Sequence, residues 1–123
     1  MKDDIRLTLA CGDYDRTRPL WDGSVRPEGI SLNCIVLEPN EIFRRMLKEE
    51  AFDVSEMSLS NYITECGKNP RRFVAIPVFL SRAFRHSNLY VNRRSGIREA
   101  RDLRGKRIGV SEYHTTLALW LRG

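Results

Sequence analysis

The sequence predicts an α/β fold: a mostly parallel sheet with helices on both faces. Two observations lead to this prediction. Two kinds of segment follow one another along the chain: short ones in which apolar and polar residues alternate, and others in which apolar residues recur at helical spacing. Glycine and proline residues separate many of these segments. Such an order makes neighbouring strands parallel, and the ligands of these sheets bind beyond the carboxyl ends of the strands.

The first half of the chain predicts two strands and two helices. Apolar residues alternate with polar ones over 5–11, which indicates a strand, and Asp13 is expected to cap a short helix over 16–20. A second strand is predicted over 30–37, where one face is apolar. Residues 42–47 have apolar side chains at helical spacing, with charged residues facing away, and predict the most strongly marked helix.

The alternation continues beyond the second helix. Val54 marks a brief strand, and a helix through Tyr62 is expected to end at Gly67. Another strand is predicted over 73–79. Pro77 bends or ends this strand, because proline has no N–H to donate to a central ladder.

The last third predicts shorter elements. Strands are expected over 88–91 and 107–110, with a short helix over 97–103 between them. A final helix is predicted from Thr115 onward. That helix carries much apolar surface, and an exposed patch of this kind needs a covering partner.

Charge and composition narrow the class of protein. The 21 Lys and Arg residues are spread among 16 Asp and Glu residues, so the net charge of +5 does not predict nucleic-acid binding. No apolar run is long enough for a membrane span or a secretory signal, so we expect a cytoplasmic protein without membrane association. Three dispersed cysteines and two histidines without convergent carboxylates predict no metal site.

Four segments resemble a known family. They read LACGDYDRTR at 9–18, DVSEMSLS at 53–60, FLSRAFRHS at 79–87 and DLRGKRIGV at 102–110. In this order they resemble the 4,5-dihydroxyphthalate decarboxylase family, and the resemblance covers nearly the whole chain. The first three segments are specific, whereas the fourth is also common among solute-binding proteins of the same fold.

The resemblance implies a type II periplasmic-binding-protein-like fold, in which two α/β lobes hold a ligand between them. Residues 1–92 would form lobe one without its returning C-terminal part, 93–102 the crossover between the lobes, and 103–123 the start of lobe two. It also implies a small aromatic dicarboxylate or another organic anion as ligand, and a reaction that uses no cofactor.

Two pairs of residues are predicted to bind this ligand. Arg82 and Arg85 each present a planar guanidinium that matches one carboxylate, and a phthalate offers two adjacent carboxylates. The alternative is that both are solvated surface arginines. Ser58 and Ser60 stand near a helix start, where free N–H groups favour an anion, although simple N-capping explains them equally well.

The predicted reaction needs an acid and an acceptor. Loss of carbon dioxide from a dihydroxyphthalate requires a proton at the ring carbon and an acceptor near the ring hydroxyls. His86 is the candidate acid, because imidazole exchanges protons near neutral pH, with a structural hydrogen bond as its alternative role. Glu56 or Asp13 is the candidate acceptor. Three further residues at predicted strand ends are expected to contact the ligand: Tyr14, Glu112 and Tyr113.

The function predicted is decarboxylation of 4,5-dihydroxyphthalate, or of a similar aromatic dicarboxylate, in an interlobe cleft. The alternative is a non-catalytic solute-binding protein for a small organic anion, which would share the fold, the cleft and the arginines. Its discriminating feature is an export signal, which the first residues do not resemble. The apolar helix from Thr115 adds the expectation of a homo-oligomer.

Overall fold

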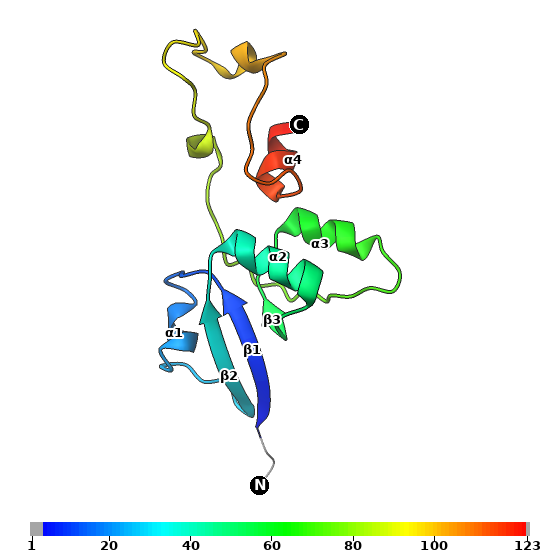
Figure 1. Ribbon diagram of the computed structural model, residues 1–123. Helices are drawn as coiled ribbons and strands as arrows, with labels where there is room; N and C mark the ends of the chain where they lie inside the picture. The colour runs from blue at the N-terminus through cyan, green and yellow to red at the C-terminus, as the bar shows by residue number, and fades with distance from the viewer. Residues whose placement is uncertain (1–3, 123) are drawn as a thin grey trace.

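The fold is built on a three-stranded parallel sheet, in a computed structural model that describes residues 4–122 (Figure 1). The strands are β1 (Ile5–Cys11), β2 (Ile30–Val36) and β3 (Val54–Ser55), and their order in the sheet is β2-β1-β3. All seven residues of β1 pair with β2, whereas β3 pairs with β1 at two positions. The predicted α/β class with a parallel sheet is confirmed.

One face of the sheet is covered by α2 (Pro39–Glu49), the helix that the sequence marks most strongly. Proline begins this helix, where its missing N–H costs no hydrogen bond. Ile42 is fully buried and packs with Ala10 of β1 and with Phe52. These three side chains form the core between helix and sheet, and part-buried apolar neighbours surround them.

The opposite face of the sheet carries α1 (Arg18–Trp21). Cys34 and Ile35 are consecutive in β2, so their side chains point to opposite faces. Ile35 packs against the core under α2, whereas the Cys34 thiol donates a hydrogen bond to the Leu20 carbonyl of α1 at 3.7 Å. Helices therefore lie on both faces, as predicted.

The predicted cap of α1 at Asp13 is wrong. Thr17 directly precedes the helix, and its hydroxyl donates to the carbonyls of Gly12 at 3.3 Å and Tyr14 at 3.1 Å. These bonds fold the chain back before the helix begins, which places the helix start beyond the reach of Asp13. The exposed Asp13 carboxylate pairs with Arg18 at 3.2 Å instead.

Two further helices, α3 (Leu59–Cys66) and α4 (Thr116–Arg122), lie side by side although they are far apart in the sequence. The first ends at Gly67, as predicted, and the second begins one residue after the predicted start. Across residues 4–122, every helix falls short of the length and apolar character that a bilayer crossing requires.

The segment between α3 and α4 contradicts three predicted strands. Residues 73–79, 88–91 and 107–110 pair with no strand in the described part of the chain. Val74, for example, is 93% exposed. A strand forms only where a neighbouring edge offers N–H and C=O groups, and an alternating sequence does not itself supply that edge.

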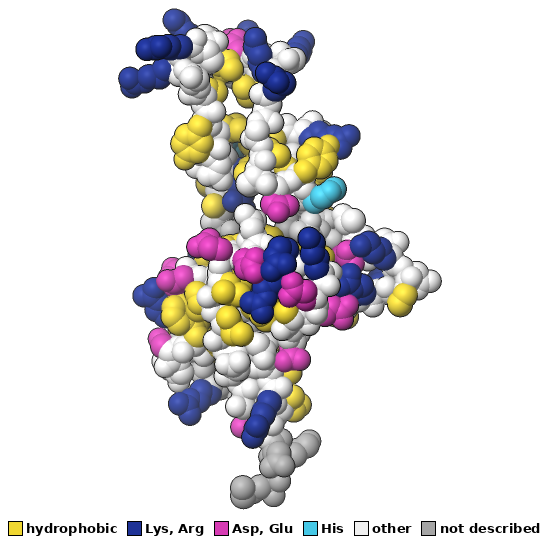
Figure 2. All heavy atoms as spheres, in the orientation of Figure 1, with side chains coloured by type: hydrophobic (Ala, Val, Ile, Leu, Met, Phe, Trp, Pro, Cys, Tyr) yellow, Lys and Arg dark blue, Asp and Glu magenta, His cyan; other side chains and the backbone are white. Residues whose placement is uncertain are grey.

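Regular structure in this segment is limited, within residues 4–122, to two 3₁₀ turns, η1 (His86–Asn88) and η2 (Ala100–Leu103). The second turn occupies part of the segment 97–103, for which the sequence predicts a helix. Figure 1 shows the segment running away from the sheet and returning to α4. Lys and Arg side chains gather at its far end (Figure 2).

An ion-pair network connects the chain after α3 to the end of α2. The Arg72 guanidinium donates to the Leu47 carbonyl at 2.7 Å and to the Glu50 carboxylate at 2.9 Å. It also lies 3.5 Å from the carboxylate of Glu65, whose side chain is only 8% exposed. A buried carboxylate is costly without partners, so this arginine stabilises the junction of the two helices.

Replacing Arg72 by alanine is expected to lower the free energy of unfolding by about 1–3 kcal/mol, because it removes two direct hydrogen bonds and one partner of a buried carboxylate. Chemical denaturation followed by circular dichroism measures the change. Arg71→Ala is the matched control, since Arg71 is exposed and forms no ion pair within residues 4–122. Equal losses from both variants would contradict the network's role.

Candidate anion-binding site

The carboxyl ends of β1 and β3 are joined through Glu56. One of its carboxylate oxygens accepts the Gly12 N–H at 2.6 Å, and the other accepts the Tyr14 hydroxyl at 2.9 Å. The Glu56 N–H in turn donates to the Ala10 carbonyl at 3.1 Å. Two residues predicted for the site, Tyr14 and Glu56, are thus in direct contact at the strand ends.

Gly12 leaves room for this contact. A methyl group on its Cα would lie 3.0 Å from the Tyr14 ring and 3.1 Å from the nearer Glu56 oxygen. Both distances are shorter than ordinary van der Waals contact. The absence of a side chain at this position therefore allows the ring and the carboxylate to close over the end of β1.

The environment of Tyr14 keeps its phenol neutral. Burial is the main cause, and the hydrogen bond to Glu56 and the negative charge of that carboxylate add to it; together they raise the pKa of Tyr14 to about 12. At neutral pH the hydroxyl therefore donates to Glu56, and its oxygen retains lone pairs that can accept a hydrogen bond from a ligand.

The Tyr14 phenol is expected to ionise near pH 12 in the folded protein. Its pKa is 10.0 in the unfolded chain, so its contribution to stability is complete below about pH 10 and is lost as the pH rises toward 12. Near-ultraviolet titration of the wild type and of Tyr14→Phe measures this step as a difference curve. A midpoint near 10 in that curve would show that Glu56 and burial do not act on this phenol.

Hydroxyl groups join the beginnings of α3 and α4. The Ser58 hydroxyl accepts the Thr116 N–H at 3.1 Å, and the Thr116 hydroxyl accepts the Ser60 N–H at 3.3 Å. Each helix is therefore capped by a hydroxyl from the other. The three hydroxyls also bond to one another through Ser58, with both distances at 3.0 Å, and Ser60 donates to the His114 carbonyl at 2.5 Å.

This hydroxyl cluster has the chemistry of an anion site. Its members are Ser58, Ser60 and Thr116, which offer three rotatable hydroxyls and two helical N–H groups. The N-terminus of α3 adds the positive end of its dipole. A carboxylate entering the cluster would receive the hydrogen bonds that the hydroxyls now give one another. N-capping and anion binding are therefore compatible here.

A mostly apolar hollow of about 310 Å³ opens beside the hydroxyl cluster. The residues that line it come from α3 and α4: Leu59, Ser60, Ile63, Thr64, Thr116, Leu119 and Trp120. The His86 ring lies edge-on to the Trp120 ring, with centroids 5.2 Å apart. His86 therefore borders the same helix that carries one member of the cluster.

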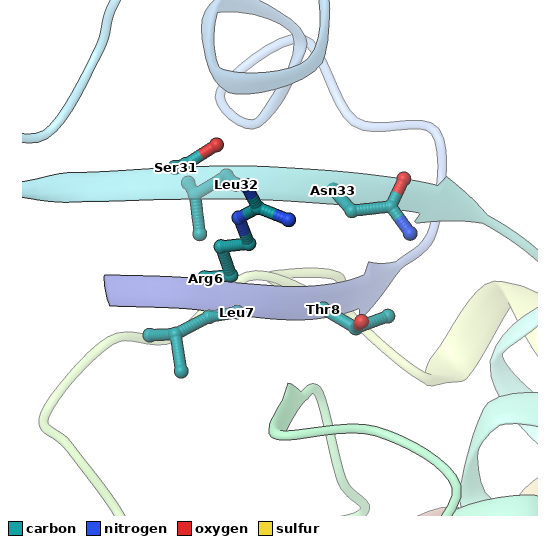
Figure 3. A pocket seen from close by; sticks show the side chains of 6 residues that line it. All are labelled: Arg6, Leu7, Thr8, Ser31, Leu32 and Asn33. Atoms are coloured by element: carbon teal, nitrogen blue, oxygen red, sulfur yellow. The ribbon is translucent and has the colours of Figure 1, made fainter. Parts of the chain in front are cut away.

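A second hollow, of about 230 Å³, lies over β1 and β2 (Figure 3). Polar side chains of Arg6, Thr8, Ser31 and Asn33 line part of it. Figure 3 shows the Arg6 side chain reaching from β1 toward β2. None of the residues predicted for the site lines this hollow, and it lies along the strands rather than beyond their ends.

The two predicted arginines lie in a segment that is held at the carboxyl end of β1, but they do not reach the hydroxyl cluster. The Arg16 guanidinium donates a hydrogen bond to the Leu80 carbonyl and lies 5.6 Å from the centre of the Tyr14 ring. These two contacts hold the 79–87 segment at the end of β1. Arg82 is exposed and donates to the Phe79 carbonyl at 3.2 Å. Arg85 is half-buried at the start of η1.

The two predicted residues before α4 lie beside the hydroxyl cluster rather than within it. Glu112 is exposed, and its carbonyl accepts the Thr115 hydroxyl at 2.9 Å. The Tyr113 hydroxyl accepts a hydrogen bond from Arg122 at 3.3 Å, and its ring meets the His114 ring edge-on. Asp13 is near the strand ends but points to solvent in its pair with Arg18.

Thr116 is the site residue that the sequence analysis missed. Its signal is the Thr-Thr pair at the start of a helix, which is typical of an N-cap. Capping preferences describe one helix at a time. They therefore gave no indication that the hydroxyl of this residue caps α3.

Comparison with known proteins tests the predicted resemblance. No protein-family model matches the chain. The chain is 44% identical over 118 residues to a 4,5-dihydroxyphthalate decarboxylase of Comamonas testosteroni, and 42% identical over 118 residues to one of Pseudomonas putida. Each match covers 96% of this chain. The predicted resemblance to the 4,5-dihydroxyphthalate decarboxylase family is confirmed.

The matches cover less of the relatives than of this chain. The chain spans 36% of the Comamonas testosteroni decarboxylase and 46% of the Pseudomonas putida decarboxylase. All ten residues predicted for the site nevertheless lie in a chain that aligns with these decarboxylases over nearly its entire length. The aligned 118 residues include both the strand ends and the hydroxyl cluster.

Proposed function

We propose that this chain provides one wall of a cleft that binds 4,5-dihydroxyphthalate, or a similar aromatic dicarboxylate, for decarboxylation. The observation that carries the proposal is the hydroxyl cluster at the meeting point of α3 and α4, two residues beyond Glu56 at the end of β3. The anion donors Ser58 and Ser60 thus closely follow Glu56, whose carboxylate accepts the neutral Tyr14 phenol at the end of β3. The similarity to the two decarboxylases supports the reaction.

In the proposed complex one carboxylate of the ligand binds the hydroxyl cluster. It replaces the bonds among Ser58, Ser60 and Thr116 with bonds to its own oxygens, and bonds to a charged acceptor are stronger than those between hydroxyls. Arg82 and Arg85 lie outside the hydroxyl cluster, and in the proposed complex their side chains turn toward the second carboxylate and neutralise it. The aromatic ring lies toward the mostly apolar hollow beside Trp120.

The proposed reaction moves one proton to the ring. A ring hydroxyl donates to the Tyr14 oxygen or to a free lone pair of Glu56 or Asp13, which raises electron density in the ring. The carbon–carbon bond to one carboxylate breaks, carbon dioxide leaves, and the electron pair stays on the ring carbon. His86 donates a proton to that carbon, so that 3,4-dihydroxybenzoate is the product. The proposal uses no cofactor.

The proposal includes the two-lobe arrangement implied by the family. Residues 1–92 belong to lobe one, 93–102 to the crossover and 103–123 to lobe two of a type II periplasmic-binding-protein-like fold in the cytoplasm. The contact of α3 with α4 then joins the two lobes across the cleft. The reciprocal capping supports this reading, because it links the helix after β3 with the last helix of the chain.

Incubating the chain with 4,5-dihydroxyphthalate tests the reaction, and calorimetric titration with the same compound tests the cleft. We expect binding, with carbon dioxide released at the rate at which 3,4-dihydroxybenzoate appears. The Comamonas testosteroni decarboxylase is the positive control. Binding without carbon dioxide would favour the alternative, a solute-binding protein for an organic anion. Absence of binding would overturn the proposal for this chain.

Replacing Thr116 by valine is expected to weaken ligand binding at least tenfold, because a hydrogen bond to a charged group contributes about 1.5–3 kcal/mol. The matched control is Thr115→Val. The Thr115 hydroxyl bonds to the Glu112 carbonyl and takes no part in the cluster, so its loss should leave the affinity unchanged. Equal affinities for both variants would exclude the hydroxyl cluster as the carboxylate site.

Arginine variants test the second carboxylate contact separately. Arg82→Ala and Arg85→Ala are each expected to weaken binding, because each removes from the protein a positive charge that attracts the doubly negative ligand. The compound with one carboxylate fewer, 3,4-dihydroxybenzoate, is the matched ligand. If neither substitution changes the affinity for the dicarboxylate, the arginines are solvated surface residues.

A further inference from the structure

The segment that carries Arg82, Arg85 and His86 has few contacts with the rest of the chain. Within residues 4–122, the hydrogen bonds that join residues 76–91 to other residues all go to the loop between β1 and α1. Phe84, in the middle of the predicted site residues, is 88% exposed. The positions of these three site residues therefore depend on a small number of anchors.

One anchor is Arg16, which precedes α1. Its guanidinium donates to the Leu80 carbonyl and lies 5.6 Å from the centre of the Tyr14 ring. A planar guanidinium can donate hydrogen bonds in its plane while its positive charge attracts the face of an aromatic ring. Ser81 adds a hydrogen bond to the Tyr14 hydroxyl, which lowers the pKa of that phenol against the larger rise caused by burial. The start of the segment is thereby held beside the phenol.

The other anchor is Trp120 of α4, whose ring meets the His86 ring edge-on with centroids 5.2 Å apart. Leu80 and His86 therefore bracket the two predicted arginines. A chain spans at most about 3.6 Å per residue, so the Cα of Arg82 lies within about 7 Å of the Leu80 Cα. Arg85 directly precedes His86, and neighbouring Cα atoms are about 3.8 Å apart. The Arg16 anchor thus restricts Arg82, whereas the Trp120 contact restricts Arg85.

We propose that Arg16 is a positioning residue, which holds Arg82 where its side chain can turn toward the second carboxylate of the ligand. The inference rests on the proposed function, because it concerns the same dicarboxylate. Arg16 does not touch the ligand and acts by keeping Leu80 at the end of β1. Its ion pair with Asp15, at 3.4 Å, contributes little, since the Asp15 side chain is 88% exposed. The contacts with Leu80 and Tyr14 are therefore what distinguish Arg16 from a solvated surface arginine.

Trypsin proteolysis of the complete folded chain, without ligand, tests the anchor. The rate of cleavage after an arginine follows the population of the form in which that segment is released. Arg16→Gln should raise the rate of cleavage after Arg82 about tenfold, because it removes a hydrogen bond from a charged donor. Arg26→Gln is the matched control, since Arg26 is exposed and donates to the Gly23 carbonyl at 3.4 Å in its own loop. Cleavage after Arg45 in α2 reports global unfolding and should not change. Equal rates after Arg82 in both variants would overturn the proposal.

A double-mutant cycle tests the role of Arg16 in binding. Calorimetry gives the affinity for 4,5-dihydroxyphthalate of the wild type, Arg16→Gln, Arg82→Ala and the double variant. We expect Arg82→Ala to weaken binding by a smaller factor when Arg16 is already replaced, because the two residues act as a unit. The same cycle with Arg85→Ala is the matched control and should be additive, since the contact of His86 with Trp120 holds Arg85 separately.

The two cycles separate this inference from the proposed function. Additive effects of Arg16→Gln and Arg82→Ala would overturn the positioning role, while ligand binding by the wild type leaves the proposed function standing. Equal coupling of Arg16 to both arginines would also overturn it, because a general loss of structure would act on both. A wild type without affinity for the dicarboxylate would overturn the proposed function and, with it, this role of Arg16.

Discussion

Ile42→Ala is expected to lower the free energy of unfolding by about 2–5 kcal/mol, a large part of the stability of a domain of this size. Ile42 is one of the two largest side chains that are fully buried among the described residues. It fills the space between α2 and the sheet, where its core neighbours are Ala10 and Phe52. The size of the loss within this range depends on how far the part-buried apolar neighbours collapse into the cavity left by its truncation.

Denaturant unfolding monitored by circular dichroism measures this effect. The matched control is Ile5→Ala, which removes the same atoms from a position that is 63% exposed at the start of β1. Its expected cost is below about 1 kcal/mol, since little apolar area returns to water. Similar costs for the two variants would mean that the contact of α2 with β1 is not the core of the fold.

Glu56→Ala is expected to lower the free energy of unfolding by about 2–4 kcal/mol. The substitution removes the acceptor of the Gly12 N–H at 2.6 Å and of the Tyr14 hydroxyl at 2.9 Å. Gly12 is buried, so its N–H is left without a partner away from water. The ends of β1 and β3 would lose the contact that holds the phenol in place.

Asp13→Ala is the control for charge at the same strand end. The Asp13 carboxylate is exposed in its pair with Arg18, and exposed pairs contribute at most about 1 kcal/mol. Glu56→Ala should also remove the part of the Tyr14 pKa rise that comes from Glu56, leaving the part due to burial. A stable Glu56→Ala protein in which the Tyr14 titration is unchanged would contradict the described contact.

Side-chain periodicity was sufficient to predict the elements that carry their own core. Residues 42–47 place apolar groups on one helical face, and α2 covers the sheet with that face. The alternation over 30–37 likewise separates Cys34 from Ile35 on opposite faces of β2. In these elements the local pattern and the tertiary contact agree, so the sequence alone identifies both.

The same reasoning failed where an element depends on a distant partner. Residues 73–79 have the composition of a strand, yet no edge within the described chain receives them. The helix start at Arg18 depends on the Thr17 hydroxyl folding back onto two carbonyls, whereas the sequence rule pointed to Asp13. Local preferences limit the secondary structure that a segment can form, and its tertiary contacts determine which structure it adopts.

Only part of the candidate site could be predicted, for the same reason. Glu56 and Tyr14 follow strands that lie side by side, so the position of strand ends was enough to bring them together. Ser58 and Ser60 were recognised as helix-start residues. Their contact with Thr116 joins a helix in the middle of the sequence to one 58 residues further on, and no spacing rule predicts such a contact.

The position of β1 bears on how the chain is made. Of the three described strands, β1 is synthesised first and lies at the centre of the sheet, so both of its partners are made after it. Synthesis of β2 closes one side, and the other stays open until residue 55 has been added. At about 5–20 residues per second, this delay lasts roughly 1–4 seconds. During that time a nascent chain presents an unprotected strand that chaperones or neighbouring nascent chains can bind.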